Sequence, residues 1–196
     1  MILYFCIYIV TQYLEDEMKK TTAQQFIENF SRTICNLTEN KTYSTLIFLC
    51  AGTDRVTGDA FGPIVGYKLK KLFGDVKNIV ILGDLEKTVC NCNIGYWVKI
   101  IYDNYTKPFI VSVDSAFSHS NENIGKVIIG KGGIYLGNGL RKEGYIIGDM
   151  SIKGIVAKDL GSPRQNFRML QNVHLNDVIK MADIVANGIF NSIDIK

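Results

Sequence analysis

The sequence predicts an α/β fold built on a mainly parallel sheet. Short apolar runs alternate with segments whose apolar residues recur at helical spacing. The runs most typical of buried strands cover residues 46–50, 78–82 and 109–113. Strands separated by helices in this way form βαβ units, in which the strands run parallel. The chain has 196 residues and is 47% hydrophobic, which is enough for one sizeable core.

Each predicted helix has an apolar stripe at helical spacing. The pattern before the first strand includes Phe26, Phe30 and Ile34, and the pattern after it begins with Pro63, a residue typical of a first helical turn. The expected helices cover residues 22–35, 63–72, 94–101 and 176–190. For the domain organisation, we expect residues 1–45 to form an N-terminal arm and helix that pack on a single domain of residues 46–196.

The region after Asn123 has a different texture. Its β-prone runs are short and are separated by glycines, at residues 126–129, 133–136 and 145–148, and residues 152–156 continue the pattern. Glycine-punctuated short runs are typical of hairpins or a meander. We therefore expect antiparallel strands here rather than another parallel crossover.

Charge and cysteine content limit the function classes. The net charge of +3 comes from 22 basic and 19 acidic residues scattered along the chain, so no basic tract indicates a nucleic-acid partner. Five cysteines without a framework spacing favour a reducing compartment, here the cytoplasm. Cys90 and Cys92 lack a second pair to complete a zinc site, and we expect them to be ordinary packing residues.

The first ten residues, MILYFCIYIV, are apolar but too short to span a bilayer. No basic segment precedes them and no small-residue cleavage site follows, so they make a poor signal peptide. We expect a strand, a packed arm or an upstream extension, with a peripheral membrane contact as the alternative. The sequence does not assign a role to this segment.

The glycine-rich loop after the first strand is the first candidate for chemistry. It contains Gly52, Thr53, Asp54, Gly58 and Asp59. Open parallel sheets bind ligands where the carboxyl ends of their strands meet such loops. The glycine spacing matches neither the dinucleotide-binding fingerprint nor a P-loop, so nucleotide binding is weakly supported.

Asp59 in this loop and Asp114 after the 109–113 run both follow strands of the predicted sheet. Two neighbouring carboxylates titrate as a pair, so that one can hold a proton while the other stays charged. Such a pair can activate water at a peptide carbonyl, or it can bind a divalent cation. The plain alternative is that Asp59 caps the following helix and Asp114 only ends its strand.

Three further residues lie in candidate loops. Ser151 and Lys153 suggest a serine nucleophile with a lysine base, although strand geometry alone places two such residues on one face. His119 follows Asp114 closely enough to reach the same pocket.

The chain resembles the YyaC family of sporulation proteins. The matching blocks are FLCAGTDRVTGDAFGPIVG, FIVSVDSAF, GKGGIYLGNGL, IIGDMSIKGIV and HLNDVIKMADIVANGI, within residues 46–191. This family in turn is similar to the hydrogenase-maturation endopeptidases and to the spore germination protease. The resemblance implies a phosphorylase/hydrolase-like fold, a three-layer sandwich with a mixed, mainly parallel sheet.

The resemblance also implies roles for residues. Asp59-Ala60-Phe61-Gly62 matches the first acidic motif of the maturation enzymes, and Asp114 matches their second acidic residue. Their third position is a histidine of a nickel-sensing site, whereas this chain has Ser151-Ile152-Lys153, which argues against nickel and against a hydrogenase role. We expect no certain cofactor, with a divalent cation at Asp59 and Asp114 as an open alternative.

The expected function is that of a spore-associated peptidase, cytoplasmic in a sporulating cell or spore, that uses Asp59 and Asp114 as catalytic residues. A peptide or protein substrate would contact Gly52, Thr53, Asp54, Gly58 and Ser151, and backbone amides of the glycine-rich loop would hold the oxyanion. Two alternatives stay open: a non-catalytic sporulation factor that binds a peptide or protein partner on the same fold, and a metal-dependent hydrolase. The sequence does not indicate the oligomeric state.

Overall fold

The computed structural model describes residues 21–39, 41–136 and 145–193. Its helices are α1 (Thr21–Thr38), α2 (Phe61–Phe73), α3 (Ile94–Asn104), α4 (Pro163–Gln171) and α5 (Leu175–Ser192), with short 3₁₀ turns η1 (Thr57–Asp59) and η2 (Asn121–Asn123). Its strands are β1 (Thr45–Cys50), β2 (Ile79–Leu82), β3 (Pro108–Ser118), β4 (Val127–Lys131), β5 (Ile134–Leu136), β6 (Tyr145–Ile147) and β7 (Met150–Lys158).

The central sheet has five strands in the order β2-β1-β3-β7-β4. Four of them run parallel, and β4 pairs antiparallel with β7 at one edge. The predicted α/β class with a mixed, mainly parallel sheet is therefore confirmed. β5 and β6 form a separate antiparallel two-stranded sheet.

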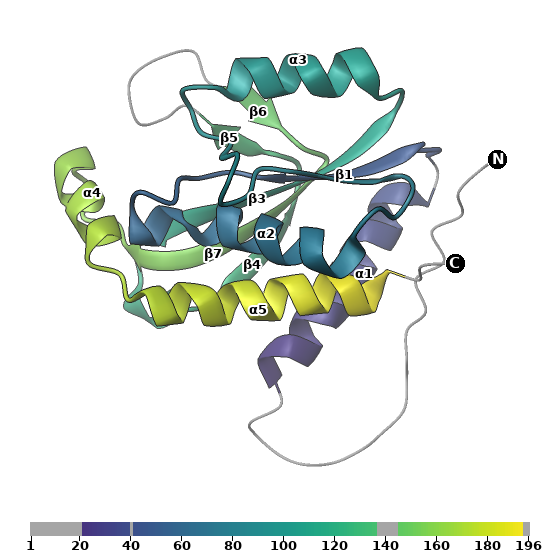
Figure 1. The fold of residues 1–196 in the computed structure, drawn as a ribbon. Coiled ribbons are helices and arrows are strands. Elements are labelled where there is room, and N and C mark those ends of the chain that lie inside the picture. Colours follow the sequence, from purple (N-terminus) through teal and green to yellow (C-terminus); the bar gives the residue numbers. More distant parts are fainter. Residues whose placement is uncertain (1–20, 40, 137–144, 194–196) are drawn as a thin grey trace.

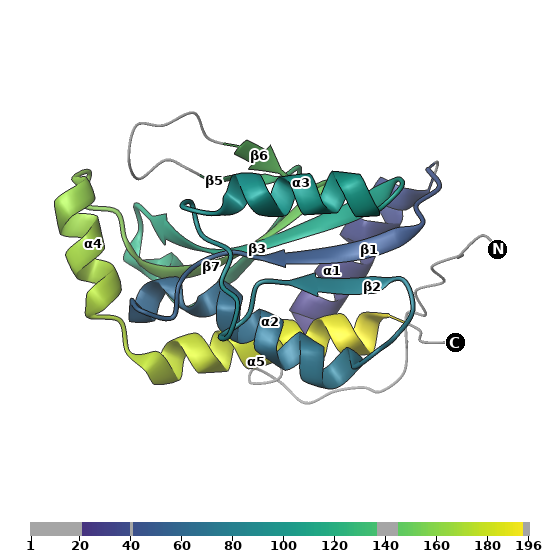
Figure 2. The ribbon, with the colours of Figure 1, turned by 45° about the horizontal axis from the view of Figure 1, so that its top comes forward.

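Helices cover both faces of the sheet, which makes three layers (Figures 1 and 2). Helices α1, α2 and α5 pack on one face, where Phe30, Phe48 and Phe61 are fully buried. Helix α3 and the β5–β6 hairpin cover the other face, around Ile47, Leu49 and other apolar residues. The stripe of α1 that the sequence analysis identified packs into the larger core, together with residues of α2 and α5.

Helix α2 lies unusually close to the sheet because glycines face its neighbours. A Cβ on Gly62 would lie 1.9 Å from the carbonyl oxygen of Ala51, and one on Gly66 would lie 1.9 Å from that of Gly83. No side chain fits at such distances, so only glycine allows this approach. The start of α2 is thereby fixed against the end of β1, next to the loop that carries Asp59.

Several predicted elements differ from those of the structure. Asp114 does not end its strand, because β3 continues to Ser118 beside β7. The antiparallel pairs expected in the glycine-rich region exist as β5–β6 and β4–β7. β7 also pairs parallel with β3, so the segment from β4 to β6 forms a crossover that was not predicted. Helix α4 was not predicted. The first ten residues lie outside the described part of the chain.

Within the described ranges, none of the helices combines the length and the hydropathy needed to cross a bilayer.

Candidate active site

Neighbouring strands bring the two predicted aspartates to one edge of the sheet. β1 and β3 pair in parallel register up to Cys50 and Val113, and the backbone amide of Ala51 donates to the carbonyl of Val113 at 2.7 Å. The chain leaves β1 there and turns through η1 to Asp59, while β3 continues into Asp114. Both aspartates are half-buried.

The turn that presents Asp59 is held by its own backbone. The amide of Thr53 donates to the carbonyl of Asp59 at 3.1 Å. Gly52 has a φ of +134° and lies so close that a Cβ there would be 2.1 Å from the same carbonyl oxygen. Gly58 is buried against Leu170 of α4. Gly52, Thr53 and Gly58 therefore shape the loop around Asp59.

Ser115 links the two carboxylates. Its hydroxyl donates to Oδ1 of Asp59 at 3.3 Å, and its backbone amide donates to Oδ1 of Asp114 at 2.8 Å. One residue therefore holds an oxygen of each aspartate. Ser115 was not predicted as a site residue. Its position directly after Asp114 is the only feature of the sequence that indicates it.

The pair has the electrostatics of coupled acids. Burial raises the pKa of Asp114 well above its usual range, the charge of Asp59 raises it further, and the Ser115 amide and the charge of Lys153 oppose the rise. Burial also raises the pKa of Asp59, against hydrogen bonds from Ser115 and from the backbone of Thr53. Two carboxylates so placed ionise in steps and share one proton over a range of pH.

Lys153 is the residue that β7 brings to the pair. It is half-buried and is the register partner of Asp114 on the adjacent parallel strand. Register partners on neighbouring strands point to the same face of a sheet, about 5 Å apart. The pair of aspartates thus has a fixed positive charge beside it.

The remaining predicted residues lie apart from the carboxylates or are used elsewhere. Asp54 is exposed at the tip of the loop. Ser151 is 3% exposed and its hydroxyl donates to the carbonyl of Gly130 at 3.4 Å, so as placed it offers nothing to a substrate. His119 does not face the aspartates: its side chain is 93% exposed and its Nδ1 lies 3.9 Å from Oδ2 of Asp159.

Most of the loop amides expected to hold an oxyanion already have acceptors. The amide of Gly52 donates to the carbonyl of Val89 at 2.8 Å, and that of Thr53 to Asp59. The amides of Asp59 and Ala60 donate to carbonyls within the turn, at 2.9 and 3.2 Å. These four groups are therefore not oxyanion donors in this conformation.

Metal binding at the pair has limited support. The described residues contain no group of three or more His, Cys, Asp or Glu side chains that could hold a metal ion. Lys153 next to Asp114 also repels a divalent cation from the site. The donors fit nickel poorly, because the site has no histidine and no thiolate. The pair by itself remains a weak site for a hard cation such as Mg²⁺.

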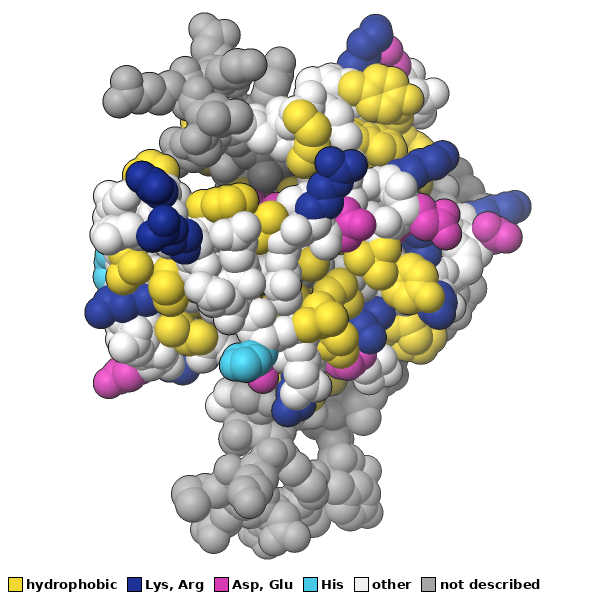
Figure 3. All heavy atoms as spheres, turned by 60° about the vertical axis from the view of Figure 1, so that its left-hand side comes forward, with side chains coloured by type: hydrophobic (Ala, Val, Ile, Leu, Met, Phe, Trp, Pro, Cys, Tyr) yellow, Lys and Arg dark blue, Asp and Glu magenta, His cyan; other side chains and the backbone are white. Residues whose placement is uncertain are grey.

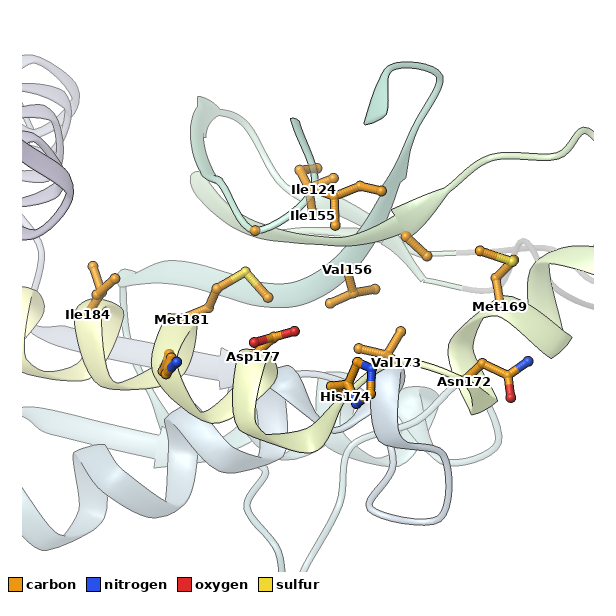
Figure 4. Close-up of a pocket in the computed structure, with 13 residues that line it drawn as sticks. Ile124, Ile155, Val156, Met169, Asn172, Val173, His174, Asp177, Met181 and Ile184 are labelled. Atoms are coloured by element: carbon orange, nitrogen blue, oxygen red, sulfur yellow. The ribbon is translucent and has the colours of Figure 1, made fainter. Parts of the chain in front are cut away.

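A pocket of about 440 Å³ lies between β7, α4 and α5 and does not include the aspartates. In Figure 4, Val156 and Met181 project toward each other across it, and His174 and Asp177 lie on the first turn of α5 at its margin. The surface on the α4 side of the molecule alternates hydrophobic, basic and neutral groups without one dominant charged tract (Figure 3).

Cys90 and Cys92 do not behave as ordinary packing residues. They form a disulfide bond in the loop between β2 and α3. The sequence prediction for this pair was therefore wrong.

The fold and the site define an α/β protein with a pair of half-buried aspartates at the carboxyl edge of its sheet. Residues 18–188 match the family described as "Protein of unknown function (DUF1256)", and the chain belongs to this family. The "Uncharacterized protein YyaC" of Bacillus subtilis (strain 168) is 33% identical over 144 residues, which are 74% of this chain and 67% of that protein. The predicted resemblance to YyaC is thus confirmed.

Among solved structures, the [NiFe] hydrogenase maturation protease HycI from Thermococcus kodakarensis KOD1 is similar, with a TM-score of 0.45 and 16% identity. The match covers 80% of this chain and 97% of that protein.

Proposed function

We propose that this protein is a peptidase that hydrolyses a peptide bond with Asp59 and Asp114. The observation that carries the proposal is the coupling of the two carboxylates: the charge of Asp59 raises the pKa of Asp114, and Ser115 hydrogen-bonds to both. Acid pairs that share a proton are the arrangement with which aspartic proteases activate water. The place of action, the cytoplasm of a sporulating cell or a spore, belongs to the proposal and follows from the resemblance to sporulation proteins.

The environments of the two side chains assign their roles. Asp114 has the more strongly raised pKa, so it holds the shared proton and acts as the general acid. Asp59 accepts hydrogen bonds from Ser115 and Thr53, which favour its charged form, so it acts as the general base. Asp59 takes a proton from water as the water attacks the carbonyl carbon, and Asp114 gives its proton to the leaving amine.

Asp54 and the backbone of the glycine-rich loop are proposed to contact the substrate around this pair, since Asp54 is exposed in the loop that carries Asp59. Ser151 would join them only after a movement of β4, because its hydroxyl is bonded to Gly130.

A binding protein without catalysis is the second candidate. It is favoured by the internal hydrogen bonds of the Gly52, Thr53, Asp59 and Ala60 amides, which occupy four of the loop donors expected for the oxyanion.

The test is cleavage of a peptide library of diverse sequence, followed by mass spectrometry, with Asp59→Asn, Asp114→Asn and Asp54→Asn variants. General acid–base groups contribute about 10²–10⁴-fold, so each change in the pair should lower the rate by that order. Asp54→Asn removes a proposed substrate contact but leaves both acid–base groups, so it should lower the rate far less than either change in the pair.

Cleavage that survives both changes in the pair would refute the mechanism. Peptides that bind without being cut, with affinity lost in the same two variants, would instead support the binding protein.

A further inference from the structure

The disulfide bond between Cys90 and Cys92 lies where a solvent thiol can reach it. Only Asn91 separates the two cysteines, and the pair directly precedes α3. Cys92 is exposed and Cys90 is half-buried. The two residues therefore differ in exposure, and we take the more exposed Cys92 as the one that a thiol attacks.

This bond contributes little to holding the fold together. A disulfide stabilises mainly by restricting the unfolded chain, and the effect grows with the length of the loop that it closes. Here the loop closes over a single residue. Disulfides of cytosolic proteins are usually transient and serve catalysis or redox sensing.

The turn that carries the cysteines is held by hydrogen bonds that do not involve sulfur. The amide of Asn93 donates to the carbonyl of Cys90 at 3.0 Å, and the amide of Cys90 donates to Oδ1 of Asn93 at 2.9 Å. Nδ2 of Asn93 donates to the carbonyl of Thr88 at 2.9 Å. The turn can therefore keep both sulfurs adjacent after the bond opens, which favours its closing again.

The position of the two cysteines before the start of α3 also favours their reduced form. This helix has 11 residues, and the side chain of Asn93 is used by the turn instead of capping the helix. The positive end of a helix dipole stabilises nearby anions, including thiolates, which are the reactive form of cysteine.

We propose that Cys90 and Cys92 form a thiol–disulfide exchange site whose co-substrate is a low-molecular-weight thiol. The thiolate attacks Sγ of Cys92, the sulfur–sulfur bond breaks, and its electron pair leaves on Sγ of Cys90. A second thiolate attacks the sulfur of the bound thiol and releases Cys92. Two thiols are oxidised to one disulfide, and the cysteine pair is reduced to two thiols, so atoms and electrons balance. The proposal does not depend on the peptidase function.

The experiment equilibrates the full-length protein with mixtures of reduced and oxidised glutathione. Alkylation followed by mass spectrometry of the peptide that contains both cysteines measures the oxidised fraction. We expect a reversible two-electron transition within the range of these buffers. A pair that stays fully oxidised in excess reduced glutathione, or fully reduced in excess oxidised glutathione, would overturn the proposal.

Two asparagines provide matched variants. Asn93→Ala removes two side-chain hydrogen bonds of the turn, and we expect the equilibrium constant for disulfide formation to fall about fivefold or more. Asn91→Ala, between the cysteines, should leave it within about twofold, since surface changes are usually near neutral. Equal values in the two variants would contradict the role of the turn.

The order of attack is tested by single cysteine variants. Cys90→Ser leaves the exposed Cys92, which should form a mixed disulfide with glutathione faster than Cys90 does in Cys92→Ser. The reverse order would refute the assignment of Cys92 as the attacked sulfur.

Discussion

Replacing Gly52 with alanine should move the turn that carries Asp59. Gly52 has a φ of +134°, which side chains rarely adopt, and an added Cβ would lie 2.1 Å from the carbonyl oxygen of Asp59 and 3.0 Å from Cδ of Pro63. Cβ contacts below 3.0 Å are essentially never seen, so the turn must open by roughly 0.9 Å at this point. The bond from the amide of Thr53 to the same oxygen, 3.1 Å long, would lengthen or break.

The expected cost follows from two effects. Backbone strain at a disallowed φ costs about 1–3 kcal/mol. Forcing an extra carbon into a packed site costs about 1–3 kcal/mol more. The free energy of unfolding should therefore fall by about 2–6 kcal/mol, and at the upper end the variant would be largely unfolded.

Gly74 provides the matched control. It also has a positive φ, of +53°, but no atom lies within 4 Å of a Cβ added there. Its ψ is −126°, outside the left-handed helical region, so Gly74→Ala should cost only the strain of this backbone conformation, about 1–3 kcal/mol. Urea unfolding, followed by the fluorescence of Trp97, the single tryptophan, measures both variants. If the two changes cost the same, the contact between Gly52 and the Asp59 turn does not constrain the site.

Two further changes test the pair and the core. Asp114→Asn should raise the free energy of unfolding at pH 7, because burial and then the charge of Asp59 raise the pKa of Asp114 in the folded protein. Because the folded pKa is above the unfolded value of about 4, the wild type loses stability as the pH rises from about 4 through the folded pKa. The variant should therefore show a flatter dependence of melting temperature on pH. A variant that is less stable than the wild type at pH 7 would contradict this. Phe30→Ala in α1 should lower the free energy of unfolding by about 3–5 kcal/mol, because Phe30 is fully buried. Arg32→Ala, an exposed change in the same helix, should change it by no more than about 0.5 kcal/mol. Equal effects would show that α1 adds nothing to the main core.

The elements with strong periodicity were predictable. The apolar runs at 46–50, 78–82 and 109–113 became β1, β2 and β3, and the long stripe at the end of the chain became α5. β1 and the first half of β3 are buried on both faces and therefore have continuous apolar runs, whereas β2 at the sheet edge is half-buried.

Helix α4 was missed for a physical reason. None of its residues is buried, and five of its nine residues are Arg, Asn or Gln, so the segment has too few apolar residues to be recognised as a core helix. The available signal was local: Ser162 precedes Pro163, and a proline in the first turn after a serine is typical of a helix start.

Strand pairing was the other limit. The residues of a strand do not identify which strand it pairs with, so nothing local shows that β7 lies beside β3. That pairing is what extends β3 beyond Asp114 and what brings Lys153 to the site. The two aspartates could be named from their positions after apolar runs. The sequence named Lys153 only as a candidate base for Ser151, and its place beside Asp114 follows only from the sheet order.

The sheet order also explains why the acids come from β1 and β3. β1 has β2 on one side and β3 on the other. The connection that leaves β1 runs over one face through α2, and the connection that leaves β3 includes the β5–β6 hairpin on the opposite face. The loops therefore diverge between β1 and β3, at the switch point where open α/β sheets bind ligands.

A third aspartate shows what the strand end alone provides. Asp84 follows β2, and although burial raises its pKa, hydrogen bonds from Lys70 and from the amides of Lys87 and Glu86 lower it overall. This side chain is a satisfied anion that fixes a turn. Asp59 and Asp114, which Ser115 links, both have raised pKa values. All three aspartates follow apolar runs of the sheet, and the pKa is raised at Asp59 and Asp114 because hydrogen bonds do not offset their burial as they do at Asp84.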